Sequence, residues 1–233
     1  MSSPTIENYV KAIHAITSLA ERGSDRTSHD ALSAPAASTG RIAEELGVLP
    51  GTVTSMLKTL QASGLADYVP YEGVRLTEAG TALALRVVRR HRLIEQFLVS
   101  TLSLTWDEVH EEAENMEHAV SDLLIDRIDA YLGFPDADPH GDPIPRSDGS
   151  MAPTDYVPLT SLESNREFRL LRVMDQSTDF LKYLTEQGLE IDRVGRLVER
   201  VETAGIVRIE VGGGETVLAA EAASKLMVRR EGV

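Results

Sequence analysis

The sequence predicts a mainly α-helical protein that ends in a small β-rich domain. Apolar residues recur at helical spacing through most of residues 1–133, a proline-rich segment follows, and short β-branched runs alternate with turns after it. With 233 residues, the chain is long enough for two or three small domains, each with its own core.

The N-terminal residues have the order helix, turn, helix, hairpin. Ser3-Pro4 is typical of a helix start, and the polar, aperiodic residues 21–38 predict an exposed loop. Residues 39–48 and 51–64 predict two short helices around a tight turn, and Glu72–Gly73 predicts a hairpin. This order is typical of a winged helix-turn-helix.

Two longer helices are predicted next. The first runs over about 78–101, and the second opens at the capping box Thr105-Trp106-Asp107-Glu108 and continues to about Leu132. Six of the ten prolines lie between Phe134 and Pro158, which predicts a linker. Beyond it the sequence predicts a short helix over 178–187, a hairpin turn at Gly212–Gly214 and strands over 168–174, 197–202, 207–211, 215–220 and 226–230.

Composition excludes several classes of protein. The chain has no cysteine, so it has neither disulfides nor a thiolate metal site. No apolar run is long enough to cross a membrane, and the N-terminus does not resemble a secretory signal, so we expect a cytoplasmic protein without a membrane partner. The formal net charge is −14, but residues 1–75 are the least acidic part, with 6 basic and 8 acidic side chains.

The densest group of metal-ligating side chains lies in HEEAENMEH, residues 110–118. On a helix, positions 110, 114, 117 and 118 share one face, which then offers two imidazoles and two carboxylates. The preceding helix carries His91 and Glu95 at i and i+4. Such groups near a core repel one another or cost desolvation energy unless a cation joins them. The pattern predicts Mn²⁺ or Fe²⁺ binding, with Zn²⁺ or Co²⁺ able to bind in vitro.

Other interpretations of this segment stay open. A solvated acidic helix face with incidental histidines has the same pattern, and a hydrolase-type metalloenzyme or a metal-buffering protein would use the same groups. Residues 110–114 do not match the zinc motif H-E-x-x-H, because the last position is Glu114 rather than His. Residues 114–118 do not match H-x-x-E-H, because the first position is again Glu114. No G-x-S-x-G motif or P-loop occurs, so we expect no catalytic residues and no small organic substrate.

The helix-turn-helix predicts a DNA-binding surface. Val53, Leu57 and Leu60 predict the buried side of the second helix. Short polar and basic side chains near the start of such a helix can contact phosphates and base edges. The candidate DNA-binding residues are Thr39, Thr52, Thr54, Ser55 and Lys58.

The whole chain resembles the diphtheria toxin repressor family of iron- and manganese-dependent regulators. The blocks RRHRLIEQFL and VHEEAENMEH carry the resemblance, together with the preceding winged helix, the proline-rich linker and the β-rich end. It implies a three-domain form that closes with a small SH3-like β-barrel domain. It further implies a metal-dependent repressor of metal homeostasis genes that binds palindromic, double-stranded operator DNA as a homodimer.

The resemblance also implies two metal sites. Carried over by position, one would use His91, Glu95 and His110, and the other Glu114, Glu117 and His118 with Asn8 from the first helix. Asp179 or Gln176 is the nearest match to a ligand from the C-terminal domain. Asn8 departs from the family, which has Asp or Met there. At the position of Glu114 the manganese-responsive branch of the family also has Glu. A carboxylate is a hard ligand, which favours Mn²⁺ over Fe²⁺.

The resemblance and the sequence pattern together predict the domain organisation. Residues 1–77 would form the DNA-binding domain and 78–133 the dimerisation and metal-binding helices. Residues 134–160 would be the linker, and 161–233 the SH3-like domain.

Overall fold

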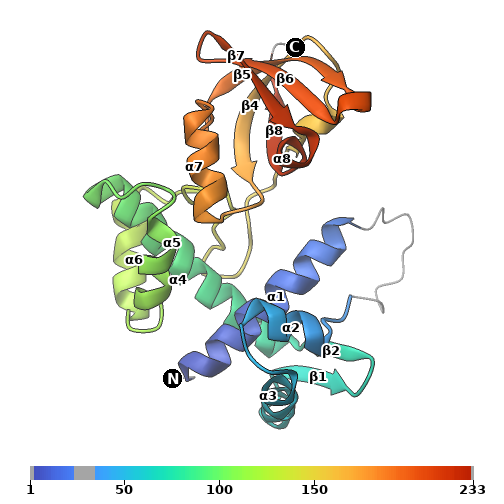
Figure 1. Ribbon diagram of the computed structural model, residues 1–233. Coiled ribbons are helices and arrows are strands. Elements are labelled where there is room, and N and C mark those ends of the chain that lie inside the picture. The colour runs from blue at the N-terminus through green and yellow to red at the C-terminus, as the bar shows by residue number, and fades with distance from the viewer. Residues whose placement is uncertain (1–2, 24–34, 232–233) are drawn as a thin grey trace. The chain divides into compact units, whose positions relative to one another are not determined.

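The computed structural model describes residues 3–23 and 35–231 (Figure 1). It divides into two compact units: Met1–Arg90 with Pro145–Gly149, and His91–Ile144 with Ser150–Val233. We refer to them as unit 1 and unit 2. No helix among the described residues is both long and apolar enough to cross a lipid bilayer.

Unit 1 contains a helix-turn-helix followed by a two-stranded wing, as the sequence predicts. Ser38 caps α2 by accepting the N–H of Arg41 at 3.3 Å, and Pro50 starts α3 after the extended residue Leu49. The buried residues Ile42 and Leu57 belong to its core. Its elements are α1 Pro4–Gly23, α2 Thr39–Glu45, α3 Pro50–Ala62, β1 Ala66–Val69, β2 Gly73–Leu76 and the start of α4 Glu78–Leu102.

The predicted exposed loop over 21–38 is wrong at both ends. α1 continues to Gly23, and Ala37 is buried, exchanging two backbone hydrogen bonds of 2.9 and 3.0 Å with Val74. Gly73 permits this pairing, since its φ is +108° and a Cβ there would lie 2.7 Å from the Ala37 carbonyl oxygen. The residues around Ala37 are small or polar, so their sequence shows no periodicity from which the pairing with Val74 could be predicted. Residues 24–34 of the predicted loop lie outside the described residues.

Unit 2 begins with the rest of α4, which packs with α5 Val109–Met116 and α6 Asp122–Tyr131. The predicted single helix from Thr105 to Leu132 is therefore wrong. The Thr105 N–H does donate to Glu108 Oε2 at 3.0 Å, but the helix starts only after that residue. Ser121 is extended and its Oγ accepts the N–H of Leu124 at 3.3 Å, so it caps a new helix rather than continuing the old one.

The C-terminal part of unit 2 is a six-stranded antiparallel sheet in the order β3-β8-β4-β5-β6-β7. The strands and the short helix predicted here are confirmed. The edge strands β3 and β7 do not pair with each other in this sheet order, so the expected barrel is open. Gly212 and Gly213 form the predicted hairpin turn, both with positive φ. The elements are β3 Val157–Pro158, β4 Arg166–Val173, α7 Thr178–Glu186, β5 Val194–Val201, β6 Ile206–Val211, β7 Gly214–Ala219, α8 Ala220–Ser224 and β8 Leu226–Arg230.

Part of the proline-rich segment, which the sequence predicted to be a linker, forms a buried turn. Asp138 and every residue from 140 to 144 are buried, and Ala137 pairs with Pro143 in an isolated β-bridge. The backbone N–H of Asp138 donates to the carbonyl oxygen of Asp142 at 3.0 Å, which closes a tight turn. We call residues 138–142 the ligand turn, because it carries two candidate metal ligands.

Candidate metal centre

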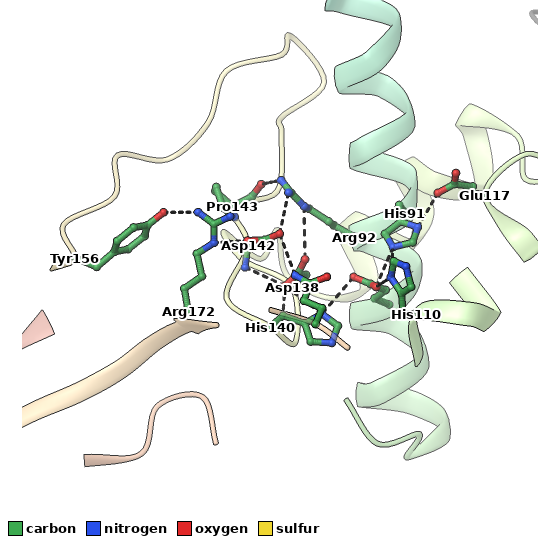
Figure 2. A network of polar contacts seen from close by, with 12 residues as sticks. His91, Arg92, His110, Glu117, Asp138, His140, Asp142, Pro143, Tyr156 and Arg172 are labelled. Atoms are coloured by element: carbon green, nitrogen blue, oxygen red, sulfur yellow. Dashed lines mark hydrogen bonds and ion pairs between the residues drawn. The ribbon is translucent and has the colours of Figure 1, made fainter. Parts of the chain in front are cut away.

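His91 and Glu95 lie one helical turn apart on α4, and both are buried. Their i, i+4 spacing places the side chains together, with His91 Nε2 at 2.9 Å from Glu95 Oε1. α5 adds His110, whose Nδ1 lies 3.1 Å from His91 Nε2 and 3.2 Å from Glu95 Oε1 (Figure 2). We call these three residues the helix cluster. The structure brings together the first predicted ligand set, whose binding of a metal stays a prediction.

The hydrogen bonds of the helix cluster leave room for a proton or a metal at its centre. The Nδ1–H of His91 donates to Glu117 Oε2 at 2.6 Å, so Nε2 of the neutral imidazole carries a lone pair. That lone pair faces a carboxylate oxygen and a second imidazole nitrogen, and a proton or a metal must lie between them. Ligand atoms of Glu114, His91 and His110 also lie within 4.8 Å of one another. Imidazole nitrogens and carboxylate oxygens without sulfur fit Mn²⁺, Fe²⁺ or Zn²⁺.

The second predicted ligand set is not gathered in the same way. Glu117 follows the last residue of α5, is fully buried, and contacts His91 and, at 3.4 Å, His118 Nε2. Glu114 instead groups with the helix cluster, and the described residues contain no ligand group that joins Glu114, Glu117 and His118. The backbone of Glu117 is still helical, but its carboxylate is directed at the ring of His91. Asn8 lies on α1 in unit 1, where its Oδ1 is buried without a hydrogen-bond partner among the described residues.

A second cluster, which sequence reasoning missed, joins Glu95 to the ligand turn. Ligand atoms of Glu95, Asp138 and His140 lie within 4.8 Å of one another, and the three residues are 1%, 4% and 0% exposed. We call them the turn cluster. The available signal was the motif Asp-Pro-His-Gly-Asp, in which metal-ligating residues alternate with turn-forming ones inside a segment assigned as linker.

The hydrogen bonds of His140 direct one ring nitrogen into the turn cluster. Its Nε2–H donates to the backbone carbonyl oxygen of Trp106 at 2.7 Å. Nδ1 then faces Glu95 Oε2 at 3.7 Å and Asp138 Oδ1 at 3.9 Å, and it has no hydrogen-bond partner among the described residues. A ring nitrogen held by a carbonyl group, with the other directed at carboxylates, is the usual arrangement of a metal-binding histidine. The turn cluster therefore also fits a divalent cation.

Shifted pKa values in the turn cluster support this. Burial raises the pKa of Asp138 to about 7, and the charges of Asp142 and Glu95 add to the effect. Burial acts to lower the pKa of His140, but its contact with the Glu95 carboxylate and the charge of Asp138 raise it to about 9. Burial acts to raise the pKa of Glu95, and its contacts with His110, His140 and His91 lower it instead. Protons balance this negative charge, and a divalent cation can take their place.

Gln176 and Asp179, the predicted ligands from the C-terminal domain, lie outside both clusters. Gln176 donates its Nε2–H to Asp142 Oδ2 at 3.1 Å, beside the turn cluster rather than in it. Asp179 lies exposed in the first turn of α7. Asp179 belongs to no group of acidic and histidine ligands among the described residues.

The helix-turn-helix presents the predicted DNA-binding side chains to solvent. Thr52, Ser55 and Lys58 are exposed on α3, opposite its buried apolar side. Thr54 is half-buried and its hydroxyl donates to the Pro50 carbonyl oxygen at 3.1 Å, so it is partly occupied within the helix. Thr39 is half-buried at the start of α2. Tyr71, which the sequence analysis did not single out, is also fully exposed, at the tip of the wing hairpin.

Comparison with known families agrees with these features. Residues 26–74 match "Iron dependent repressor, N-terminal DNA binding domain", and residues 77–146 match "Iron dependent repressor, metal binding and dimerisation domain". Residues 157–230 match "FeoA domain". The helix cluster and the ligand turn both lie within the second match.

Similar proteins are transcriptional regulators rather than enzymes, as expected from the failed catalytic motifs. Iron-dependent repressor IdeR of Mycobacterium tuberculosis (strain ATCC 25618 / H37Rv) is 34% identical over 189 residues, 76% of this chain and 78% of that protein. The diphtheria toxin repressor of Corynebacterium glutamicum is 28% identical over 82% of this chain and 86% of that protein. The regulator MntR of Lysinibacillus sphaericus is 34% identical over 55% of this chain and 81% of its own length.

Solved structures with the same fold include a manganese-dependent transcriptional repressor in complex with manganese, with a TM-score of 0.81 and 37% identity over 97% of this chain and 99% of that one. The manganese regulator SloR has a TM-score of 0.74 and 33% identity over 99% of this chain and 100% of its own. The chain therefore belongs to the family of iron- and manganese-dependent transcriptional repressors.

Proposed function

We propose that this chain is a repressor that binds palindromic operator DNA as a homodimer when Mn²⁺ or Fe²⁺ is bound, and that it controls metal homeostasis genes. The observation that carries the proposal is the pair of ligand clusters that share Glu95, in a chain that also has a helix-turn-helix. In this proposal residues 1–77 bind DNA, 78–133 dimerise and bind metal, 134–160 connect, and 161–233 form the SH3-like domain.

The helix cluster and the turn cluster would hold the metal. Their oxygen and nitrogen ligands support Mn²⁺ or Fe²⁺, while Zn²⁺ or Co²⁺ would also bind in vitro. A bound divalent cation would supply the positive charge that these buried carboxylates and imidazole lone pairs require. The chain's own contribution is orientation: Glu117 fixes the ring of His91, and the Trp106 carbonyl group fixes that of His140. Ligation by Asn8, Glu114, Glu117 and His118 as a further set stays a prediction.

Exposed apolar side chains support the homodimer. They lie at the end of α4, on α6 and just after it, in the segment that matches the dimerisation domain. Apolar side chains left exposed in such a segment are candidates for the contact between protomers. The residues are Leu102, Leu123, Leu124, Tyr131 and Phe134, which are 47–70% exposed.

Operator binding would use α3 in the major groove of the DNA. Lys58 would contact phosphate, while the short hydroxyl side chains of Thr52 and Ser55 would contact phosphates or base edges. Thr39 at the start of α2 and Thr54 complete the proposed surface. A two-fold dimer would place its two recognition helices on half-sites about one helical turn, or a multiple of it, apart.

A mobility-shift experiment tests the proposal. The full chain is titrated onto the promoter fragment of its own operon with Mn²⁺, with Fe²⁺ under anaerobic conditions, and with chelator. We expect a shifted complex only when metal is present, and a palindrome in its footprint. Binding that chelator leaves unchanged, or no binding to any promoter fragment, would contradict a metal-dependent repressor.

A further inference from the structure

A carboxylate outside both clusters ties the ligand turn to the helix and to the sheet. We propose that Asp142 is a positioning residue: clamped between Arg92 of α4 and Arg172 of β4, it holds the ligand turn so that the turn cluster is pre-formed and its occupancy is transmitted to the C-terminal sheet (Figure 2). The proposal rests on the proposed function, since it requires a metal at the turn cluster.

The helix side of the clamp is made by Arg92. Its Nη2 donates to Asp142 Oδ2 at 3.0 Å, and its Nη1 donates to the carbonyl oxygen of Pro143 at 2.5 Å. Its Nε lies 3.5 Å from Asp138 Oδ2. Arg92 precedes Glu95 by three residues, so one turn of α4 carries both a ligand of the turn cluster and the group that holds the ligand turn.

The sheet side of the clamp is made by Arg172, which is 6% exposed. Its Nε contacts Asp142 Oδ1, and its Nη1 donates to the Tyr156 hydroxyl oxygen at 2.8 Å. Gln176 donates to the other carboxylate oxygen of Asp142 at 3.1 Å. One oxygen of a carboxylate that is 8% exposed therefore accepts hydrogen bonds from Arg92 and Gln176, and the other is ion-paired with Arg172.

The backbone of the ligand turn is in direct contact with β4. The N–H of Val173 donates to the His140 carbonyl oxygen at 2.9 Å. Gly141 has φ +82°, and a Cβ there would lie 1.8 Å from the Leu171 carbonyl oxygen, so no other residue fits. A displacement of the turn must then displace β4 or break these contacts.

Within the turn, Asp138 is oriented by its own backbone. Its Oδ1 accepts the N–H groups of His140 at 2.8 Å and Asp142 at 3.0 Å. The conformation that places both ligands toward Glu95 is thus the one that the clamp holds. Asp142 itself belongs to no ligand group among the described residues, which distinguishes positioning from ligation.

Positioning and simple charge effects predict opposite results for Arg172→Met. Removing a buried cation near a metal site should tighten cation binding if charge alone matters. If the clamp positions the ligand turn, the same change should weaken Mn²⁺ binding by about 10- to 100-fold, as loss of an outer partner of a metal ligand does. Arg172→Lys, which keeps the charge, should recover part of the affinity.

The chain has a built-in reporter for this experiment. Trp106, its only tryptophan, stacks on His140 with the rings 6.4 Å apart and inclined by 16°, so its fluorescence reports on the turn cluster. The full-length protein is titrated with Mn²⁺ while this emission is followed. The matched control is Arg169→Met, on the same strand but paired with Glu231, and it should leave the midpoint unchanged. An Arg172→Met midpoint that is unchanged or tighter overturns the proposal.

Two further measurements test the proposal if Arg172→Met does not fold. The first uses Asp142→Asn, which keeps the shape of the side chain and should weaken Mn²⁺ binding, as Arg172→Met should. In the wild-type protein, Mn²⁺ should slow hydrogen exchange at the Val173 amide; unchanged exchange contradicts transmission to the sheet.

If wild-type protein and Glu95→Gln bind Mn²⁺ equally, the metal site and with it the proposed function fail. If they differ while Arg172→Met matches Arg169→Met, only the positioning role fails.

Discussion

The helix cluster and the turn cluster share Glu95 but are assembled in different ways. The helix cluster takes its ligands from α4 and α5, where His91 and Glu95 follow the period of one helix. The turn cluster takes two ligands from a turn that lies much later in the chain. A metal site on helices can be detected from spacing, whereas one completed by a turn becomes evident only when the chain is folded.

The two clusters also differ in their access to solvent. The side chain of His110 in the helix cluster is 48% exposed, while those of His140 and Glu95 are 0% and 1% exposed. A cation bound at the helix cluster would therefore have access to water on the side of His110. A cation in the turn cluster would be enclosed and its exchange would depend on opening of the ligand turn.

The largest expected effect comes from the residue that the clusters share. Glu95→Gln removes a charged ligand from both, so Mn²⁺ affinity measured by calorimetry should fall by more than about 100-fold. Metal-dependent DNA binding should be lost with it. The control is Glu112→Gln, an exposed carboxylate on α5, which should bind Mn²⁺ as the wild type does. Retained affinity in Glu95→Gln would mean that neither cluster binds the metal.

Single histidine variants should separate the clusters. His110→Ala should remove metal from the helix cluster only, and His140→Ala from the turn cluster only, so each should lower the number of bound Mn²⁺ ions by one. Mass spectrometry under native conditions counts them. The release of Mn²⁺ to a chelator should have two phases, and His110→Ala should remove the faster one. Equal loss of both phases in either variant would show that the clusters form one site.

A smaller effect is expected from the partner of His91. Glu117→Gln keeps an oxygen that can accept the Nδ1–H but loses the charge that makes this imidazole a stronger ligand, so affinity at the helix cluster should fall by about 10-fold. Binding at the turn cluster, followed by Trp106 fluorescence, should not change. Glu111→Gln, an exposed neighbour on α5, is the control. A loss of the same size in both variants would assign the effect to net charge.

The smallest effect should come from outside both clusters. Lys58→Ala should weaken binding to all DNA sequences and reduce the slope of log affinity against log salt concentration by about one unit. Mn²⁺ binding should stay at the wild-type value. Lys182→Ala changes the same charge on α7 and should leave the salt slope unaltered. Lost sequence discrimination with an unchanged slope would mean that Lys58 contacts a base.

Local patterns in the sequence were sufficient for most of the fold. Helical periodicity predicted α1, α3 and α4, and β-branched runs predicted the strands of the C-terminal sheet. The predicted long helix after Thr105 was wrong because both of its halves have helical periodicity, and the break is marked by Ser121, which is extended and caps α6. Such a cap is a single local hydrogen bond at a helix start, which periodicity does not describe.

The sequence by itself determined that His91, Glu95 and His110 are candidate ligands: local helical spacing pairs His91 with Glu95, and the resemblance to the repressor family adds His110. It also determined that no sulfur ligand is available, since the chain has no cysteine. Only the tertiary structure decided that Asp138 and His140 join Glu95. That contact depends on the buried ligand turn, on Gly141 against β4 and on the Asp142 clamp, all of which unite segments that are remote in sequence.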